Sequence, residues 1–209
     1  LPIYERKGTS VLAVSVAPSF AAKWLVPRLE RFTRAHPNLD VRISPSMELS
    51  DFRGDQIDIA VRFGFGDYPG LVVDKLIDES VVPLCSPALM SGEHPLETPD
   101  DLRHHSLLHD ESIQFDSTTP DWAMWLKAAG VEADASRGPR FNQSSLVIEA
   151  AALGKGVALA KATLAAADLA EAAAFEGDPA GGRFALAQQR SVQGSVALDG
   201  VTVVAFLRE

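Results

Sequence analysis

Short polar side chains occur where several apolar, β-branched segments of this sequence end. Ser19 follows such a segment at 11–16, and Asp110 follows another at 106–109. Ligands of α/β proteins bind beyond the carboxyl ends of strands, where helix N-termini direct N–H groups outward. Side chains at these points are therefore candidates to bind a small polar or anionic molecule. The candidate binding residues are Pro18, Ser19, Phe20, Ser44, Ser46, Arg62, Phe63, His109, Asp110, Asn142 and Ser144.

The serine and asparagine candidates have structural alternatives. Ser19 equally suits the N-cap of the helix that follows it, and Asn142 and Ser144 suit the start of another helix. Ser44 and Ser46 follow a strand, where serine commonly forms turns. Because one residue can cap a helix and also contact a ligand, the sequence leaves these alternatives open.

Arg62 is the one cation at a strand end in the first part of the chain. Its guanidinium could bind a carboxylate through two parallel hydrogen bonds. It could equally pair with one of the sixteen acidic residues in 43–121. The aromatic candidates, Phe20 and Phe63, are more typical of a hydrophobic core than of a pocket wall.

Three histidines close to acidic residues are possible metal ligands. His104, His105 and His109 lie near Asp110 and Glu111, but their spacing matches neither HExxH nor a paired Cys/His signature. Adjacent residues point about 100° apart on a helix and to opposite faces on a strand. No Ser/His/Asp triad can be assembled from spacing either. We therefore expect no metal, no cofactor and no enzymatic activity.

Two smaller features favour structural roles. The single cysteine, Cys85, excludes an internal disulfide and suits a reducing compartment. It has no adjacent cation to activate the thiol, so a buried, inert cysteine is favoured over a thiol sensor. Gly154-Lys155-Gly156 lacks the GxxxxGK[ST] spacing of a phosphate loop and predicts a tight turn before a strand.

Segments with the pattern of strands alternate along the chain with segments with the pattern of helices. This order is that of a parallel sheet with crossover helices. Thr98-Pro99-Asp100-Asp101 has the pattern of a helix start, and Gly130 that of a helix C-terminal cap. Pro27 lies inside a helical pattern, so that helix is kinked or begins there. The expected strands are 11–16, 39–43, 57–61, 81–84, 106–109 and 157–160, and the expected helices are 19–36, 121–129, 144–154 and 162–174.

Length and charge narrow the class of protein. The chain has 209 residues, with 19 Lys and Arg against 28 Asp and Glu, a net charge of −9. Residues 1–42 hold seven basic and three acidic residues, whereas 43–121 hold four basic and sixteen acidic. Such a chain is a poor binder of the phosphate backbone. No apolar run reaches the roughly 18–20 residues of a membrane span, and Leu1-Pro2-Ile3 does not resemble a signal peptide.

Several segments together resemble the effector-binding domain of LysR-type transcriptional regulators, in particular the glycine-cleavage-activator-like subgroup. The resemblance implies an α/β fold of two Rossmann-like lobes joined by two crossover strands, a type 2 periplasmic-binding-protein-like architecture. It places lobe I at 9–83 plus about 185–209 and lobe II at 84–184, with the N-terminal winged helix-turn-helix absent from this chain. The segments are VSVAPSFAAKWLVPRLERFTRAHPNLDVRIS (14–44), DIAVRFGFGDYPGL (58–71), VVPLCSPAL (81–89), TPDDLRHHSLLHDE (98–111), RGPRFNQSS (137–145) and GKGVALAKATLAAADLA (154–170).

The resemblance implies a cytoplasmic, ligand-sensing regulatory domain rather than an enzyme. Its expected partners are a small polar or carboxylate-bearing effector, a second copy of itself, and DNA only through the missing domain, with tetramers in the full-length protein. The effector would bind between the lobes, and the candidate residues above match positions where related regulators hold effectors. The alternative is a periplasmic-type solute-binding protein, which shares the two-lobe fold.

The end of the chain departs from this family pattern. Members usually continue with an aromatic-rich strand that returns to the first lobe, followed by a closing helix. Residues 170–209 contain three Phe and neither Tyr nor Trp. We expect the return crossing near 184–196 and the start of the closing helix at 203–209, VVAFLRE.

Overall fold

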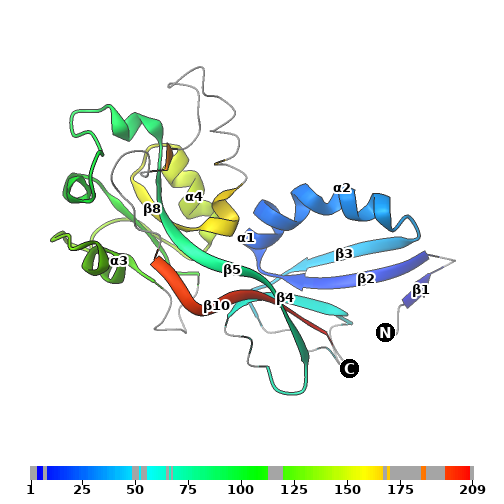
Figure 1. Ribbon diagram of the computed structural model, residues 1–209. Helices are drawn as coiled ribbons and strands as arrows, with labels where there is room; N and C mark the ends of the chain where they lie inside the picture. Colours follow the sequence, from blue (N-terminus) through cyan, green and yellow to red (C-terminus); the bar gives the residue numbers. More distant parts are fainter. Residues whose placement is uncertain are drawn as a thin grey trace. The chain divides into compact units, whose positions relative to one another are not determined.

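The computed structural model divides the chain into two units (Figure 1). Unit 1 comprises Leu1–Glu79 and Asp199–Glu209, and unit 2 comprises Ser80–Leu198. Each contains a sheet and helices, as expected for an α/β fold. The structure describes residues 4–6, 9–48, 52, 56–64, 66, 68–112, 120–166, 169, 185–186 and 196–207.

The sheet of unit 1 is built around β2. This strand pairs in parallel with β3, where Val16 lies opposite Pro45, and with β4, where Val16 lies opposite Val61. The three strands confirm the predicted strands at 11–16, 39–43 and 57–61, and their carboxyl ends lie at one edge of the sheet. Two further strands, β1 and β10, pair antiparallel with β2 and β4 respectively. The bounds are β1 Tyr4–Arg6, β2 Thr9–Val16, β3 Leu39–Pro45, β4 Ile59–Gly64 and β10 Val196–Leu207.

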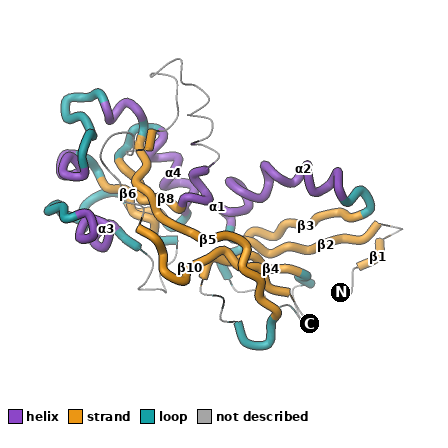
Figure 2. Tube along the Cα trace, in the orientation of Figure 1, coloured by secondary structure: helices purple, strands orange, loops and turns teal. Residues whose placement is uncertain are grey.

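The first helical segment of unit 1 changes type along its length. It runs as α1 (Pro18–Phe20), a π-helical turn (Ala21–Leu25) and α2 (Val26–Ala35), which lies alongside β2 and β3 (Figure 2). Pro27 is in the first turn of α2, where its missing N–H is tolerated. The prediction that Ser19 is the N-cap is wrong, because Ala17 occupies that position and Ser19 is buried within α1.

The prediction that 203–209 starts a closing helix is also wrong. Strand β10 continues to Leu207, and its residues 202–207 pair antiparallel with β4 from Gly64 to Ile59. The segment VTVVAFL is rich in β-branched residues, which favour a strand over a helix. The predicted helix at 162–174 is described only at 162–166 and 169, which are helical.

The sheet of unit 2 has β6 at its centre. It pairs in parallel with β7 and with β8, and β8 pairs antiparallel with the last part of β5. Helix α4 packs against both β6 and β8. These strands confirm the predictions at 81–84, 106–109 and 157–160. The bounds are β5 Val72–Cys85, β6 Leu107–Asp110, β7 Arg140–Phe141, β8 Val157–Lys161, β9 Ala185–Leu186, α3 Trp122–Ala129 and α4 Ser144–Ala152, with 3-10 helices at Pro87–Met90 and Pro99–His104.

Local signals fix most helix ends in unit 2. The Asp101 carboxylate accepts the Thr98 N–H at 2.8 Å, which begins the second 3-10 helix where the sequence predicts a helix start. The Asp121 carboxylate accepts the Met124 N–H at 2.8 Å and caps α3, which ends at Gly130 with φ +70°. Helix α4 differs from the prediction, because Gln143 is its N-cap residue and Ser144 already lies inside the helix.

The core of unit 2 lies between these elements. Trp122 and Trp125 of α3 are each 1% exposed and meet edge to face with ring centroids 5.7 Å apart. The Trp122 indole N–H donates to the Leu108 carbonyl at 2.9 Å, so α3 is tied to the central strand by a buried hydrogen bond. Cys85 is buried, and burial raises the pKa of its thiol to about 11, which agrees with the expected inert cysteine.

The turn between α4 and β8 depends on two glycines, and the prediction of a tight turn at 154–156 is confirmed. Gly156 has φ +151°, and a Cβ on it would lie 2.2 Å from the Ser106 carbonyl oxygen. That oxygen also accepts the Val157 N–H at 2.9 Å, so it is held in place by the sheet. Gly154 has φ +69°, but a Cβ there would meet only Ser86 Cβ at 3.9 Å.

We therefore expect Gly156→Ala to destabilise the domain by about 3 kcal/mol, because steric overlap with backbone adds to the conformational strain. Gly154→Ala is the matched control and should cost only about 1 kcal/mol, the strain alone. Urea unfolding of both variants measures the difference. Equal losses of unfolding free energy in the two variants would show that steric overlap with the Ser106 carbonyl does not contribute to the destabilisation.

Candidate functional site

A buried polar cluster lies at the carboxyl end of β6, and we call Asp110, Ser112, Ser144 and Lys161 the Asp110 cluster. Asp110 Oδ2 accepts the Ser144 hydroxyl at 2.6 Å and Lys161 Nζ at 3.1 Å. Asp110 Oδ1 accepts the Ser112 backbone N–H at 2.9 Å. Lys161 Nζ also donates to Ser144 Oγ at 3.2 Å, and the two serine hydroxyl oxygens lie 3.0 Å apart. The cluster thus connects β6, α4 and β8.

Burial makes this cluster electrostatically strong. The side chains of Lys161 and Asp110 are 10% and 15% exposed. Burial by itself raises the pKa of Asp110, but the Lys161 charge and the hydrogen bonds from Ser112 and Ser144 outweigh it and hold that pKa below its usual value. Asp110 is therefore a carboxylate, and its only roles in hydrogen bonding are those of an acceptor.

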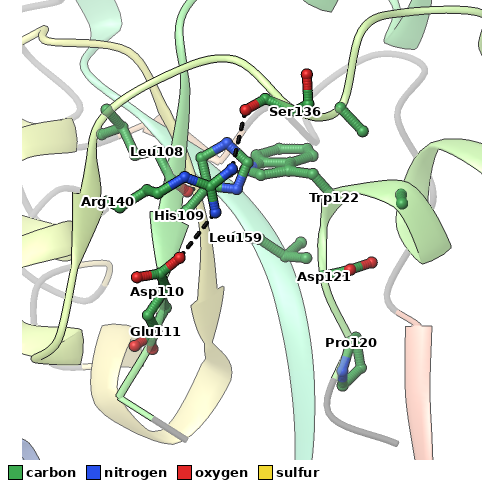
Figure 3. Close-up of a pocket in the computed structure, with 12 residues that line it drawn as sticks. Leu108, His109, Asp110, Glu111, Pro120, Asp121, Trp122, Ser136, Arg140 and Leu159 are labelled. Carbon is green, nitrogen blue, oxygen red and sulfur yellow. Dashed lines mark hydrogen bonds and ion pairs between the residues drawn. The ribbon is translucent and has the colours of Figure 1, made fainter. Parts of the chain in front are cut away.

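A pocket of about 410 Å³ opens beside the same strand end (Figure 3). In Figure 3, His109, Arg140 and Glu111 lie on one side of it, and Pro120 and Asp121 lie on the other. A pocket with apolar walls and a few polar groups is the usual form of a small-molecule site. Its lining residues are Leu108, His109, Asp110, Glu111, Pro120, Asp121, Trp122, Ala123, Ala135, Ser136, Arg140 and Leu159.

The charged groups around the pocket are paired. Arg140 Nη1 donates to Glu111 Oε1 at 2.7 Å, and Arg140 Nη2 donates to the Ser136 carbonyl at 2.9 Å. His109 Nε2 lies 3.0 Å from the Arg137 carbonyl oxygen. These pairings orient the side chains before any ligand binds, which lowers the entropic cost of binding.

The remaining candidate of unit 2, Asn142, is exposed between β7 and α4. The candidates His109, Asp110, Asn142 and Ser144 are therefore brought together at one end of the unit 2 sheet. Sequence reasoning missed Ser112 and Lys161. The signal for Lys161 was present in VALAK (157–161), because a lysine that ends a fully buried strand requires a buried partner.

In unit 1, Arg62 is 6% exposed at the end of β4. It donates to Ser15 Oγ at 2.7 Å, to the Glu48 carbonyl at 2.8 Å and to the Val61 carbonyl at 2.9 Å. Burial lowers the pKa of its guanidinium, and the nearby Tyr68 partly offsets this effect. Arg62 thus joins β4 to β2 and to the segment after β3.

The other candidates of unit 1 lie at the same sheet edge. Pro18 begins α1, and Phe20 is buried and stacks on Trp24 with ring centroids 4.9 Å apart. Ser44 is in β3, opposite Ser15. Ser46 follows β3, and its hydroxyl oxygen accepts the Glu48 N–H at 3.0 Å, the turn contact named as its alternative role. Phe63 is half-buried in β4.

The histidines do not gather around a common centre. The rings of His94 and His104 stack with centroids 4.6 Å apart, whereas His109 contacts Arg137. Within the described ranges, no group of three or more His, Cys, Asp or Glu side chains could hold a metal ion. Within the same ranges, no helix is long and apolar enough to cross a membrane.

Comparison with known proteins agrees with this arrangement. The LysR substrate binding domain family matches residues 6–199. The chain belongs to this family. It is 42% identical to the glycine cleavage system transcriptional activator of Escherichia coli K12 over 168 residues, which cover 80% of this chain and 53% of that protein. It is 37% identical to the transcriptional activator AmpR of Pseudomonas aeruginosa over 162 residues, which cover 77% of this chain and 52% of AmpR.

The fold is shared with a solved member of the family. The effector domain of Pseudomonas aeruginosa AmpR aligns with a TM-score of 0.71 and 29% identity, over 95% of this chain and 86% of that one. These findings confirm the predicted fold class and family. The relatives are transcriptional regulators rather than enzymes or solute-binding proteins, which agrees with the expected regulatory role and disfavours the alternative function. The chain spans about half the length of the curated relatives it matches.

We expect Lys161→Met to destabilise the domain by about 3–5 kcal/mol, because it leaves the Asp110 carboxylate buried without its counter-charge. Arg140→Gln is the matched control, since it breaks the Arg140–Glu111 pair, whose side chains are 49% and 38% exposed. That exposed pair should contribute at most about 1 kcal/mol. Urea unfolding at pH 7 measures the unfolding free energy of both variants. A similar decrease in the two would contradict the larger contribution expected of the buried Asp110–Lys161 pair.

The lowered pKa of Asp110 also predicts a pH dependence. A carboxyl with a lower pKa in the folded state stabilises the fold above its unfolded pKa, about 3.9, and loses that contribution as pH falls through its folded pKa. The unfolding free energy of the wild type should therefore fall more steeply below about pH 4 than that of Asp110→Asn. Asp40→Asn, at an exposed position of β3, should retain the steep wild-type dependence. Parallel curves for Asp110→Asn and wild type would exclude this contribution.

Proposed function

We propose that this chain is the ligand-sensing part of a LysR-type transcriptional regulator and that it binds a small polar or carboxylate-bearing effector. The observation that carries the proposal is the family match across residues 6–199 together with the polar cluster and pocket at the end of β6. AmpR, a relative, has a domain described as an effector domain, which supports the same role here.

We propose that the effector contacts lie at the strand ends of each unit. In unit 2 the Asp110 cluster fixes the strand end, while the exposed Asn142 supplies an amide that a ligand can reach. In unit 1 the buried Arg62 fixes the corresponding edge, where Ser44 and Ser46 lie. The proposed contact residues are Pro18, Ser19, Phe20, Ser44, Ser46, Arg62, Phe63, His109, Asp110, Asn142 and Ser144.

The regulator would bind DNA through an N-terminal domain in the cytoplasm. The acidic character of 43–121 supports this division, because a segment with sixteen acidic residues and four basic ones is poorly suited to bind the phosphate backbone. Effector binding would change the relative population of two conformations of the domain, and this change would reach DNA through the attached domain.

The domain would also pair with a second copy of itself. Helix α4 supports this proposal, because Leu146 of α4 and Leu153, the C-cap residue directly after it, are 48% and 62% exposed and lie seven residues apart. Exposed leucines in such an arrangement favour burial in an interface. Tetramers would form in the full-length regulator.

The effector proposal is tested by a thermal-shift screen of amino acids and small organic acids. At least one compound should raise the Tm of the wild-type domain, since a ligand that binds only the folded state stabilises it. Asn142→Ala should reduce that shift without changing the Tm of the free domain, because Asn142 is exposed. Asn38→Ala, in an exposed turn of unit 1, is the control and should respond as wild type. An equal response of both variants would remove Asn142 from the site.

The self-association proposal is tested by sedimentation equilibrium of the domain. Leu153→Lys should weaken the dimer at least about tenfold, because it places a charge in an apolar interface. Lys155→Glu is a control that changes charge two residues away at another exposed position. A wild-type domain that remains monomeric, or a Leu153→Lys dimer of unchanged affinity, would contradict the proposal.

A further inference from the structure

The hydroxyl hydrogens of the Asp110 cluster can be assigned from its chemistry. A serine hydroxyl donates one hydrogen and accepts two hydrogen bonds. Ser144 donates its hydrogen to Asp110 Oδ2, which is a carboxylate oxygen and can only accept. Ser144 Oγ also accepts from Lys161 Nζ, which can only donate. Ser144 therefore has one remaining position, and it is an acceptor position.

This assignment fixes the direction of the next hydrogen bond. Ser112 Oγ lies 3.0 Å from Ser144 Oγ. Because Ser144 has no second hydrogen, Ser112 must be the donor. Ser112 then has no hydrogen left for a ligand, whereas both lone pairs of its hydroxyl oxygen are available. Ser112 is half-buried, and two residues just before it, Asp110 and Glu111, line the pocket.

We infer that Lys161 determines the effector class: its ion pair with Asp110 directs the hydroxyls of Ser144 and Ser112 so that the site presents an acceptor, which binds an effector with an N–H donor, in particular an ammonium group. This inference rests on the proposed function, because it assumes that the effector reaches the end of β6. Lys161 itself acts as a positioning residue and does not touch the ligand.

The role of Lys161 follows from what its loss would do. Loss of the ammonium removes the largest influence that lowers the pKa of Asp110, so this pKa rises. A protonated Asp110 would donate to Ser144 Oγ, which would release the Ser144 hydrogen toward Ser112. Ser112 would then direct its own hydrogen outward, and the site would prefer an acceptor such as a carboxylate.

The charges around Asp110 do not replace Lys161. On β6 and just after it, His109 contacts the Arg137 carbonyl, and Glu111 is paired with Arg140 of β7. From α4, Ser144 supplies a hydroxyl but no charge. Among the contacts that the structure gives for the Asp110 carboxylate, Lys161 of β8 is the only cation. Replacing Lys161 should therefore change the direction of the Ser112 hydrogen bond, because no other cation among these contacts can replace its charge beside Asp110.

The test uses methylammonium chloride and sodium acetate as probes, with the Ser112 amide resonance observed by NMR and potassium chloride as the ionic control. In the wild type, methylammonium should shift this resonance and acetate should not, throughout pH 5–8. Ser112→Ala removes only a half-buried hydroxyl and should weaken methylammonium binding about tenfold, judged at the Asp110 amide. In Lys161→Met the preference should become pH-dependent, with acetate bound at low pH and methylammonium at high pH.

Neutron diffraction of the free domain supplies a readout that needs no ligand and no variant. The deuteron of Ser112 should lie between the two serine oxygens, and that of Ser144 should point to Asp110. A deuteron donated from Ser144 to Ser112, or a wild-type preference for acetate, would overturn the inference, as would the absence of any response to methylammonium. If methylammonium binds at Ser112 but no compound of the thermal-shift screen stabilises the domain, the proposed function fails and the hydrogen-bond assignment stands.

Discussion

The buried ion pair between Asp110 and Lys161 is the interaction on which the organisation of unit 2 depends. It joins the last residue of β6 to the last residue of β8, and through the Ser144 hydroxyl it also holds the first residue of α4. Two charges in a protein interior are tolerated only when they are paired and their remaining hydrogen-bonding positions are filled. Ser112 and Ser144 fill several of these positions, so the ends of three elements are fixed with respect to one another.

This constraint also explains why the pocket lies where it does. On the same strand, the Leu108 carbonyl accepts the Trp122 indole N–H, which fixes the start of α3. The helix starts of α3 and α4 are thus both attached to β6, and the pocket is lined by β6, β7 and the start of α3. Parallel strands place their carboxyl ends together, so helices that follow different strands begin at one edge of a sheet. A ligand site at this edge requires no additional scaffold.

The sequence predicted those features that depend on local chemistry. Asp121 and Gly130 mark the ends of α3 because a carboxylate caps N–H groups and glycine adopts positive φ at low cost. Features that depend on tertiary contacts were less accessible. Ser19 resembles an N-cap but is buried in α1, and 203–207 pairs with β4 rather than forming a helix. Lys161 was missed because its partner is 51 residues away in the sequence.

The same distinction applies to the candidate site. Residue type and strand position were sufficient to select Asp110 and Ser144, since polar groups at strand ends face an open edge. The hydrogen-bonding character of the site was not predictable in this way, because it is a property of the whole cluster. Ser112 is an acceptor only because Ser144 must donate to an ionised Asp110, and Asp110 stays ionised because Lys161 is beside it. A substitution at a residue that a ligand never touches can therefore change which ligand the domain selects, and the specificity of a sensor of this kind should be sought in its buried charges as much as in its pocket walls.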